Sequence, residues 1–400
     1  MFKAISIARH NLNARIYLIY SFLQSLWFTE AVWYFYWSRF LTFSQIGIVF
    51  SCLVILGLVA EIPTGYIADR YGRKNSVVGG TILLFLGAVL MTSATSAVLL
   101  ILGVSVMSIG RAFISGALEA IVYDDLRKNN LHTMWDSLLS TKIQISLVAY
   151  ILAVPIGGFL YNLHFRLPNT LEALSMALSI FMALKLNDNS HRQQLLENKL
   201  KVGELLVGFR QLLSKRLTPY LLPAFMVISI FELYDWGLSK PAMAVSFGYD
   251  AQGQSIVYTL LAVLNIITIG LMPSLRRRVG DYWGLRLLNI VSGVAFVAST
   301  YVIGVFGIGI LWLLETAGNL GDPWTSSVVN ENTESKYRAT TLSTLAFMTR
   351  VPHLFVNIIA GIALDSYGIA PFHWWLGIAI VLMVLLSTIS RKRPYLTSNT

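Results

Sequence analysis

The chain has 400 residues, of which 56% are hydrophobic and only 12% are charged. Soluble domains average roughly 25% charged residues, so these values exclude a protein whose main solvent is water. The formal net charge of +10 could suggest a nucleic-acid partner, but the positions of the basic residues matter more than their sum, and we expect no nucleic-acid binding. Cys52 is the only cysteine, which excludes an internal disulfide and a multi-cysteine metal site, and we expect no metal or cofactor.

Long apolar segments recur along the whole chain. A helix needs about 20 apolar residues to cross the roughly 30 Å hydrocarbon layer of a bilayer. Apolar runs bounded by charged, Gly or Pro clusters predict an all-α membrane protein with about twelve transmembrane helices. The predicted spans are residues 15–38, 44–66, 76–94, 97–121, 143–162, 170–187, 218–239, 254–275, 285–304, 307–329, 341–364 and 372–390.

The only long polar connection runs from Asn187 to Thr218. Its leucines are spaced as on an amphipathic helix that lies in the cytoplasmic membrane interface. The connection divides the chain into an N-terminal six-helix bundle at 1–187, an amphipathic linker at 188–217 and a C-terminal six-helix bundle at 218–400.

The basic residues indicate the orientation of the chain. With the N-terminus inside, 25 of the 30 Lys and Arg residues fall on the cytoplasmic side, three fall outside (Arg39, Arg166 and Lys240), and Arg111 and Arg350 lie within spans. Since cytoplasmic loops carry an excess of Lys and Arg, both termini are predicted to be cytoplasmic.

The two halves resemble copies of one another at an offset of about 202 residues. Glu30 in the first span aligns with Glu232 in the seventh, each among aromatic residues, and Arg39 or Lys240 follows at the outer end. Internal repeats of this kind are typical of transporters that bind their substrate near the bilayer midplane.

A charged motif follows the second span, where residues 61–74 read EIPTGYIADRYGRK. This stretch resembles the loop signature of the major facilitator superfamily, Gly-x-x-x-Asp-Arg-x-Gly-Arg-Lys. We expect Gly65 to let two helices approach closely and Gly72 to permit a tight turn. The resemblance implies a major facilitator fold of two six-helix pseudo-repeats and a cytoplasmic gate. The residues assigned to this gate are Gly65, Asp69, Arg70, Gly72, Arg73, Lys74 and Asp124.

In the family, the aspartate and second arginine of this motif join a charge network with the end of span 4 and the beginning of span 11. Asp69 and Arg73 match those positions, and Glu119, Asp124 and Asp125 supply acids near the end of span 4. The second half carries a worn copy of the motif, residues 270–281, that lacks the acidic position and so gives weaker support for a gate. Pro155 to Gly158 in span 5 is close to a signature of the superfamily's antiporters.

Ionisable residues inside the predicted spans are candidates for function, because a charge at the bilayer centre costs roughly 2.5–3.5 kcal/mol or more. Glu315, Asn319 and Asp322 share one face of span 10, and Arg350, His353 and Asn357 share one face of span 11, so Arg350 is predicted as a counter-ion for span 10. Acids outnumber permanent bases, which favours protonation, a water-filled cavity or a cationic substrate. The predicted proton and substrate cavity consists of Glu30, Glu232, Asp235, Glu315, Asp322, Arg111 and Arg350.

These features together favour a secondary active transporter that exports small amphipathic or cationic compounds in exchange for protons, by alternating access. The alternative is proton-coupled uptake of a nutrient such as a sugar, an organic anion or a peptide, in which Arg111 and Arg350 bind the substrate. An enzyme is not expected, because the chain has no His-Glu-x-x-His motif, nucleophile elbow or phosphate-cradling loop. We expect a monomer in the inner (plasma) membrane that interacts with a small-molecule substrate, protons and the lipid bilayer.

Overall fold

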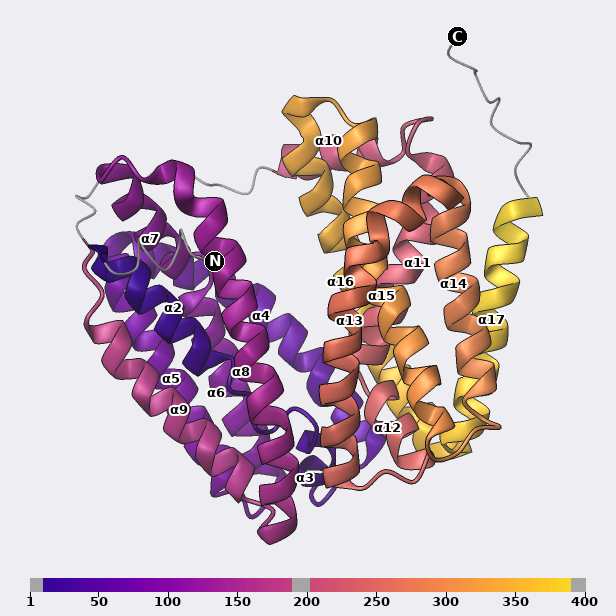
Figure 1. Cartoon of the computed structure of the whole chain (residues 1–400), viewed down its shortest axis with the longest axis horizontal. Coiled ribbons are helices and arrows are strands. Elements are labelled where there is room, and N and C mark those ends of the chain that lie inside the picture. The colour runs from indigo at the N-terminus through magenta and orange to yellow at the C-terminus, as the bar shows by residue number, and fades with distance from the viewer. Residues whose placement is uncertain (1–9, 189–201, 390–400) are drawn as a thin grey trace. The chain divides into compact units, whose positions relative to one another are not determined.

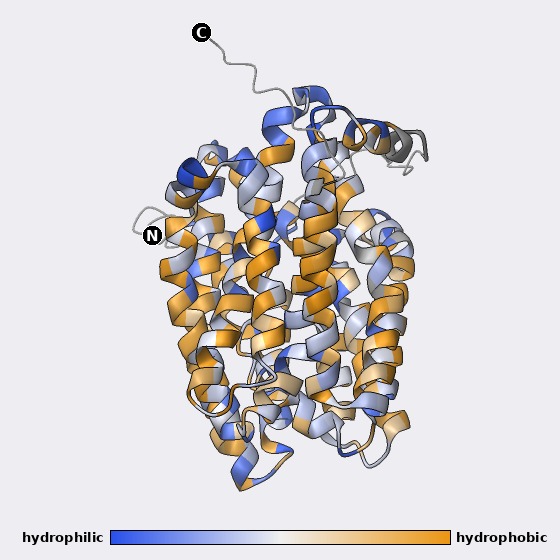
Figure 2. Ribbon diagram, turned by 90° about the vertical axis from the view of Figure 1, so that its right-hand side faces the viewer, coloured by the Kyte–Doolittle hydropathy of each residue, from blue (hydrophilic) through white to orange (hydrophobic). Residues whose placement is uncertain are grey.

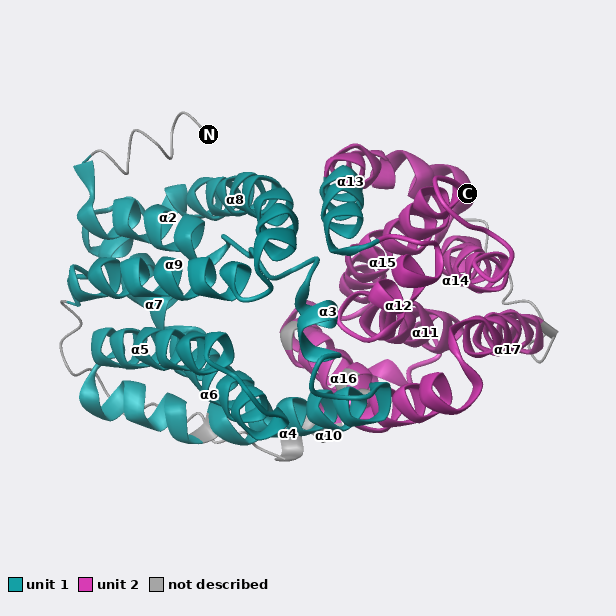
Figure 3. Cartoon of the chain, turned by 90° about the horizontal axis from the view of Figure 1, so that it is seen from below, with its two compact units in different colours: residues 1–197, 250–262 teal, residues 198–249, 263–400 magenta. Residues whose placement is uncertain are grey.

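The computed structural model describes residues 10–188 and 202–389, and within these ranges it consists of helices joined by turns and short loops (Figure 1). The chain divides into two compact units, shown in different colours in Figure 3. Unit 1 comprises Met1–Glu197 and Asp250–Ala262, and unit 2 comprises Asn198–Tyr249 and Val263–Thr400. The predicted boundaries at 187 and 218 stay predictions.

Unit 1 begins with a short helix and continues with five long helical segments. Its helices are α2 (Leu12–Gln24), α3 (Trp33–Trp37), α4 (Phe43–Tyr71), α5 (Arg73–Thr92), α6 (Ala97–Ile114), α7 (Ala117–Lys128), the 3-10 turn η1 (His132–Met134), α8 (Trp135–Leu163) and α9 (Leu167–Leu184). The first turns of α13 (Ala251–Val279) also belong to this unit.

Unit 2 contains the rest of α13 and seven further α-helices. These are α10 (Val202–Leu212), α11 (Thr218–Asp235), α12 (Ser239–Ser246), α14 (Asp281–Ala298), α15 (Phe306–Asn332), α16 (Arg338–Tyr367) and α17 (Ile369–Ile389), with the 3-10 turn η2 (Ser335–Tyr337) before α16.

Every predicted span contains helical structure in its described part. In the described ranges eight helices are long and apolar enough to cross a membrane, and the bent pair α11–α12 makes a ninth. Helices α2 with α3, α14 and α15 cover the remaining predicted spans at 15–38, 285–304 and 307–329, although they are shorter or more polar. The prediction of an all-α membrane protein is confirmed, and the helices are consistent with about twelve spans.

The outward faces of the helices are apolar. Figure 2 shows that hydrophobic residues dominate the middle of the long helices. Large apolar side chains such as Val59, Phe159, Ile267 and Phe355 are exposed. An exposed apolar surface of this extent is unfavourable in water and suits contact with lipid chains.

Three predicted spans are interrupted. The segment predicted as one helix at 15–38 is non-helical between α2 and α3. In the segment predicted at 218–239, α11 ends at Asp235, and the chain bends by 58° before it continues as α12. The segment predicted at 97–121 is broken at Gly116, which has a φ of +73°, and then continues as α7 to Lys128. Apolar composition runs through all three breaks, so hydropathy alone does not reveal them.

The first break also changes the predicted alignment of the two halves. Glu30 lies in the non-helical stretch between α2 and α3, whereas Glu232 lies within α11, one turn from its end. One acid therefore lies between helices and the other lies within a helix, so the two do not occupy equivalent positions. The offset of 202 residues between them does not describe the repeat.

The predicted linker at 188–217 falls partly outside the described residues, at 189–201. Its described part includes α10, which packs against α16 within unit 2. At the contact a Cβ on Gly208 would collide with the side chain of Thr344, and Leu212 at the end of α10 is buried. This part of the predicted linker is packed against protein within unit 2.

Candidate functional site

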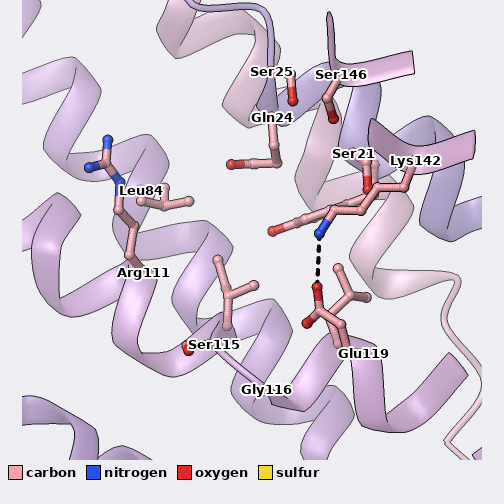
Figure 4. A pocket seen from close by; sticks show the side chains of 13 residues that line it. Ser21, Gln24, Ser25, Leu84, Arg111, Ser115, Gly116, Glu119, Lys142 and Ser146 are labelled. Atoms are coloured by element: carbon pink, nitrogen blue, oxygen red, sulfur yellow. Dashed lines mark hydrogen bonds and ion pairs between the residues drawn. The ribbon is translucent and has the colours of Figure 1, made fainter. Parts of the chain in front are cut away.

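Unit 1 contains a polar cavity of about 440 Å³ (Figure 4). Pockets that bind small molecules have volumes of roughly 300–1,000 Å³, so the cavity is large enough for one. Its walls come from α2, α5, the α6–α7 break and α8. The lining residues that carry polar side chains are Tyr20, Ser21, Gln24, Ser25, Arg111, Ser115, Glu119, Lys142 and Ser146.

Three charged side chains line this cavity. Lys142 on α8 donates from Nζ to Oε1 of Glu119 on α7 at 3.0 Å, and both side chains are about one-third exposed. Arg111 on α6 lies on the opposite side of the cavity from this pair (Figure 4). The cavity therefore presents two cationic groups and one carboxylate, which gives it a net positive charge when all three are ionised.

A buried carboxylate supports the break between α2 and α3. Glu172 on α9 is 8% exposed, and its Oε2 accepts from Oγ1 of Thr29 at 2.5 Å and from the Thr29 backbone N–H at 3.3 Å. A break in a membrane-spanning helix frees backbone groups that lipid cannot hydrogen-bond, so these bonds satisfy one of them. On the other side, a Cβ on Gly157 of α8 would collide with the Phe28 carbonyl, so only glycine leaves room for the break there.

Unit 2 contains a second charged cluster, which is buried. Lys240 on α12 donates from Nζ to Oδ1 of Asp235 at 2.6 Å and lies 3.3 Å from Oε2 of Glu315 on α15. Asn265 on α13 donates to Oε1 of Glu315 at 2.8 Å. The Lys240 side chain is only 5% exposed, and that of Glu315 is 11% exposed. We refer to Asp235, Lys240 and Glu315 as the buried trio.

The bend between α11 and α12 creates this cluster. Asp235 is the last residue of α11 and Lys240 is the second residue of α12, so their salt bridge spans the three-residue break. The 58° change of direction turns Lys240 inward, whereas we had predicted it at the outer end of a straight helix. Lys240 is thus the described cation beside Glu315. The pairing of Arg350 with span 10 stays a prediction, because the side chain of Arg350 lies outside the described residues.

The remaining predicted cavity residues lie in varied surroundings. Glu30 and Glu232 are half-buried, whereas Asp322 is exposed although it shares a helix with the buried Glu315. The side chains of Arg350 and His353 lie outside the described residues. The structure therefore brings together Asp235 and Glu315 of the predicted acids and does not place Asp322 with them.

The charged motif of unit 1 forms a tight turn and an ion pair. Gly72 links α4 to α5 with a φ of +96°, a conformation that favours glycine. Directly after it, Arg73 donates to Asp124 at the end of α7 at 2.5 Å. The carboxylate of Asp188 accepts from the backbone N–H of Lys74 at 3.2 Å, near the first turn of α5, where helix N–H groups lack partners.

The other motif residues make weaker contributions. Asp69 and Arg70 are exposed, and Arg70 donates to the Tyr66 hydroxyl at 2.8 Å. Gly65 has no described atom within 4 Å of the position of a Cβ, so the close helix approach that we expected there is not observed. Glu119 pairs with Lys142 in the cavity, and Asp125 accepts from Asn11 at 2.6 Å, so of the acids predicted for the network only Asp124 meets the motif. The contact of the motif with span 11 stays a prediction.

The worn copy of the motif in unit 2 forms a more extensive network. Gly280, with a φ of +73°, links α13 to α14 as Gly72 links α4 to α5. Arg276 donates to both carboxylate oxygens of Asp281, at 2.7 and 2.9 Å, and to both of Glu331, at 2.7 Å each. Trp324 donates from Nε1 to Asp281 at 2.8 Å. Although this copy lacks the acidic position of the motif, it forms more ion-pair contacts in the described residues than the copy in unit 1, and whether it acts as a gate is not tested by these contacts.

Several of these residues are absent from the sequence-based site. Lys240 and Lys142 were assigned to membrane faces by the excess of cytoplasmic basic residues, and Asn265 is uncharged. Glu172 could have been found, since it is an acid inside the predicted span 170–187. In the described part of the chain, no group of three or more His, Cys, Asp or Glu side chains is arranged to hold a metal ion.

Known proteins share this architecture. The chain is 21% identical over 372 residues to YxaM of Bacillus subtilis (strain 168), an MFS-type transporter, with 89% of each chain covered. It is 26% identical over 266 residues to Multidrug resistance protein 1 of the same organism, with 64% of each chain covered. The crystal structure of the nucleoside transporter NupG superposes with a TM-score of 0.78 at 15% identity, covering 96% of this chain and 100% of that one.

The decisive comparison is with a family model rather than with one relative. The model of the Major Facilitator Superfamily matches residues 14–314, which is most of the chain and includes the charged motif, the cavity of unit 1 and the break between α11 and α12. The relatives and structural neighbours are transporters and not enzymes. This chain belongs to the Major Facilitator Superfamily, and it is an integral membrane transporter of small molecules.

Proposed function

We propose that this transporter couples the efflux of small amphipathic or cationic compounds to proton entry. The buried trio of unit 2 is the observation that carries this proposal. Its two carboxylates and one ammonium have a net charge of −1 when all three are ionised, in a setting where Lys240 is almost fully buried. Among the described side chains, Lys240 is the cation that pairs with these two carboxylates. A net charge in such a site is unfavourable, so the trio favours binding of a proton or of another cation.

The hydrogen bonding of the trio indicates where the added proton has room. Lys240 donates to Asp235, but its 3.3 Å approach to Glu315 is an ion pair without hydrogen-bond geometry. Oε2 of Glu315 therefore lacks a hydrogen-bond partner among the described residues. A proton on this oxygen would neutralise the cluster and weaken the hold of Glu315 on Lys240.

Coupling to conformation follows from the position of the trio. Because the Asp235–Lys240 bridge spans the α11–α12 break, a change in the charge balance of the trio acts on the bend itself. A cationic substrate and a proton would compete for the same net negative charge. Such competition is the thermodynamic basis of exchange, since binding of one lowers the affinity for the other.

The direction of transport is supported by the relatives. One of them is a multidrug resistance protein, and the Pro155 to Gly158 stretch is close to an antiporter signature. We propose that the Arg73–Asp124 pair serves as the cytoplasmic gate, and that the protein is a monomer in the inner membrane with both termini in the cytoplasm. Glu30, Glu232, Asp322 and Arg350 remain candidates for the transport path.

Transport by proteoliposomes with an imposed pH gradient tests the proposal. A lipophilic cationic dye is the probe, and proton flux is followed with a pH-sensitive dye trapped inside. We expect Glu315→Gln and Asp235→Asn to abolish proton-driven dye movement. Glu334→Gln, which removes an exposed acid on the loop before α16, should transport as the wild type does. Proton-coupled dye transport that persists in both trio variants would overturn the proposal.

A second candidate function is proton-coupled uptake of an organic anion. The cavity of unit 1 favours it, because Arg111 and Lys142 give this cavity a net positive charge. The same proteoliposomes separate the two functions when sugars, amino acids and carboxylates are tested beside the dye. Protons moving in the same direction as a carboxylate support uptake, and protons moving against the dye support efflux.

A further inference from the structure

Glu172 is a buried acid that the proposed coupling through the trio does not use. It lies on α9 of unit 1, away in sequence from every residue of the trio, and is 8% exposed. Both of its described hydrogen bonds are accepted from Thr29, one from the hydroxyl and one from the backbone N–H. An ionised carboxylate accepts such bonds more strongly than a protonated one.

The residue that Glu172 holds is connected to the cavity. Thr29 lies in the break that follows α2, and Gln24 and Ser25, at the start of this break, line the cavity. Within the break, the Trp27 indole donates to the Gln24 carbonyl at 2.8 Å and packs edge-on against Tyr150 of α8. A loss of the Thr29 bonds would therefore change the segment that carries two cavity residues.

Arg111 supplies a second connection. It lines the cavity, and the field of a fixed cation reaches a buried carboxylate over a longer distance inside a protein than in water. Helix α9 packs against α2, α5 and α8. The other ionisable groups on these three helices are the tyrosines Tyr17, Tyr20, Tyr150 and Tyr161 and the charged residues Arg15, Arg73, Lys74, Asp136 and Lys142. Glu30 directly follows Thr29, the hydrogen-bond partner of Glu172, in the sequence.

We infer that Glu172 is a second proton-binding site, located in unit 1 and linked to ligand occupancy of the polar cavity through Arg111 and the α2–α3 break. An anionic group bound beside Arg111 would reduce the positive field at Glu172 and so raise its affinity for a proton. By linkage, a proton on Glu172 would raise the affinity of the cavity for an anionic group by the same factor. The inference rests on the proposed function in one respect: a proton bound at Glu172 contributes to coupling because transport is proposed to be proton-coupled.

Infrared spectroscopy of proteoliposomes tests the site without transport. The carbonyl stretch of a protonated carboxyl group, followed as pH is lowered, should lose one component in Glu172→Gln and keep it in Glu172→Asp and in Glu315→Gln. Arg111→Gln should raise the proton affinity of this component about tenfold, because a nearby opposite charge favours the ionised form. Thr29→Val, which removes one hydrogen bond to the carboxylate, should also raise the proton affinity of this component.

The inference is overturned if the Glu172→Gln spectrum keeps every component, or if Arg111→Gln leaves the titration unchanged. The Glu172→Gln variant should still fold, since its new amide oxygen can accept from Thr29, and size-exclusion chromatography checks this. The two proposals fail separately. Loss of proton coupling is measured by flux in the trio variants, whereas the Glu172 component is measured in protein that need not transport.

Discussion

Each unit contains a lysine paired with a carboxylate, but the two pairs differ in their surroundings. In unit 1, Lys142 and Glu119 are each about one-third exposed and line an open cavity. In unit 2, Lys240 is 5% exposed and faces two carboxylates. Water screens the first pair, so its members can exchange partners with a ligand. The buried trio is screened much less, so a single added proton changes its charge balance strongly.

The cytoplasmic turns show a second contrast, in the order of the charges. After Gly72 the chain places a base, Arg73, which pairs with Asp124. After Gly280 it places an acid, Asp281, which pairs with Arg276 of the preceding helix. The acids at the ends of α7 and α15, Asp124 and Glu331, complete both networks, so equivalent positions build ion pairs from charges in the opposite order.

The largest effect is expected from removing the two lysines. Lys240→Met removes the cation that pairs with the buried Glu315 and the partly buried Asp235, and breaking a buried pair in this way costs about 3–5 kcal/mol in the free energy of unfolding. Lys142→Met removes an exposed partner and should cost under about 1 kcal/mol. Thermal unfolding of the purified protein in detergent measures both. Adding Glu315→Gln should restore part of the loss from Lys240→Met, and equal effects of the two lysine variants would contradict the contrast in burial.

The break between α2 and α3 provides the next test. Gly157→Ala places a methyl group against the Phe28 carbonyl, and overpacking of this kind costs about 1–3 kcal/mol. Gly57→Ala on α4, where no described atom lies within 4 Å of the new methyl group, is the matched control and should be neutral or slightly stabilising. If both variants unfold at the wild-type temperature, the close approach of α8 to the break is absent in solution.

The two cytoplasmic networks should differ in strength. Arg276→Met removes bidentate bonds to two acids and is expected to cost about 1.5–3 kcal/mol, the range for hydrogen bonds to charged groups. Arg73→Met removes one bond between partners that are 33% and 40% exposed, and should cost about 1 kcal/mol or less. Denaturant unfolding in detergent compares them, and a larger loss for Arg73→Met would reverse our ranking.

The smallest effect is a pH dependence at Glu331. Its hydrogen bond with Arg276 lowers the pKa of Glu331 below the ordinary glutamate value. A lowered folded-state pKa stabilises the protein at pH values above the unfolded-state pKa of about 4.3, and this contribution disappears as pH falls through the folded-state pKa. The difference in unfolding temperature between the wild type and Glu331→Gln should thus be present at neutral pH and shrink on acidification. A difference that grows on acidification would contradict the lowered pKa of Glu331.

Many of the site residues can be identified from the sequence, but the ion pairs and hydrogen bonds between them cannot. Asp235 and Glu315 stand out as acids in apolar helices, and the motif around Gly72 is legible from its spacing. Lys240 was predicted at the membrane face because a straight helix would carry it there, and only the bend after Asp235 turns it back. Glu172 gave a sequence signal as well, but its partner Thr29 is 143 residues away, and no local pattern links the two.

The sequence by itself determined the class of the molecule, because the length, spacing and number of apolar segments are dictated by the thickness of the bilayer, and because the charged motif is a local feature. The tertiary structure alone decided where the helices break, which charges are buried and which acid meets which base. These outcomes depend on contacts between helices distant in the chain, and the desolvation of each charge in those contacts sets its chemistry.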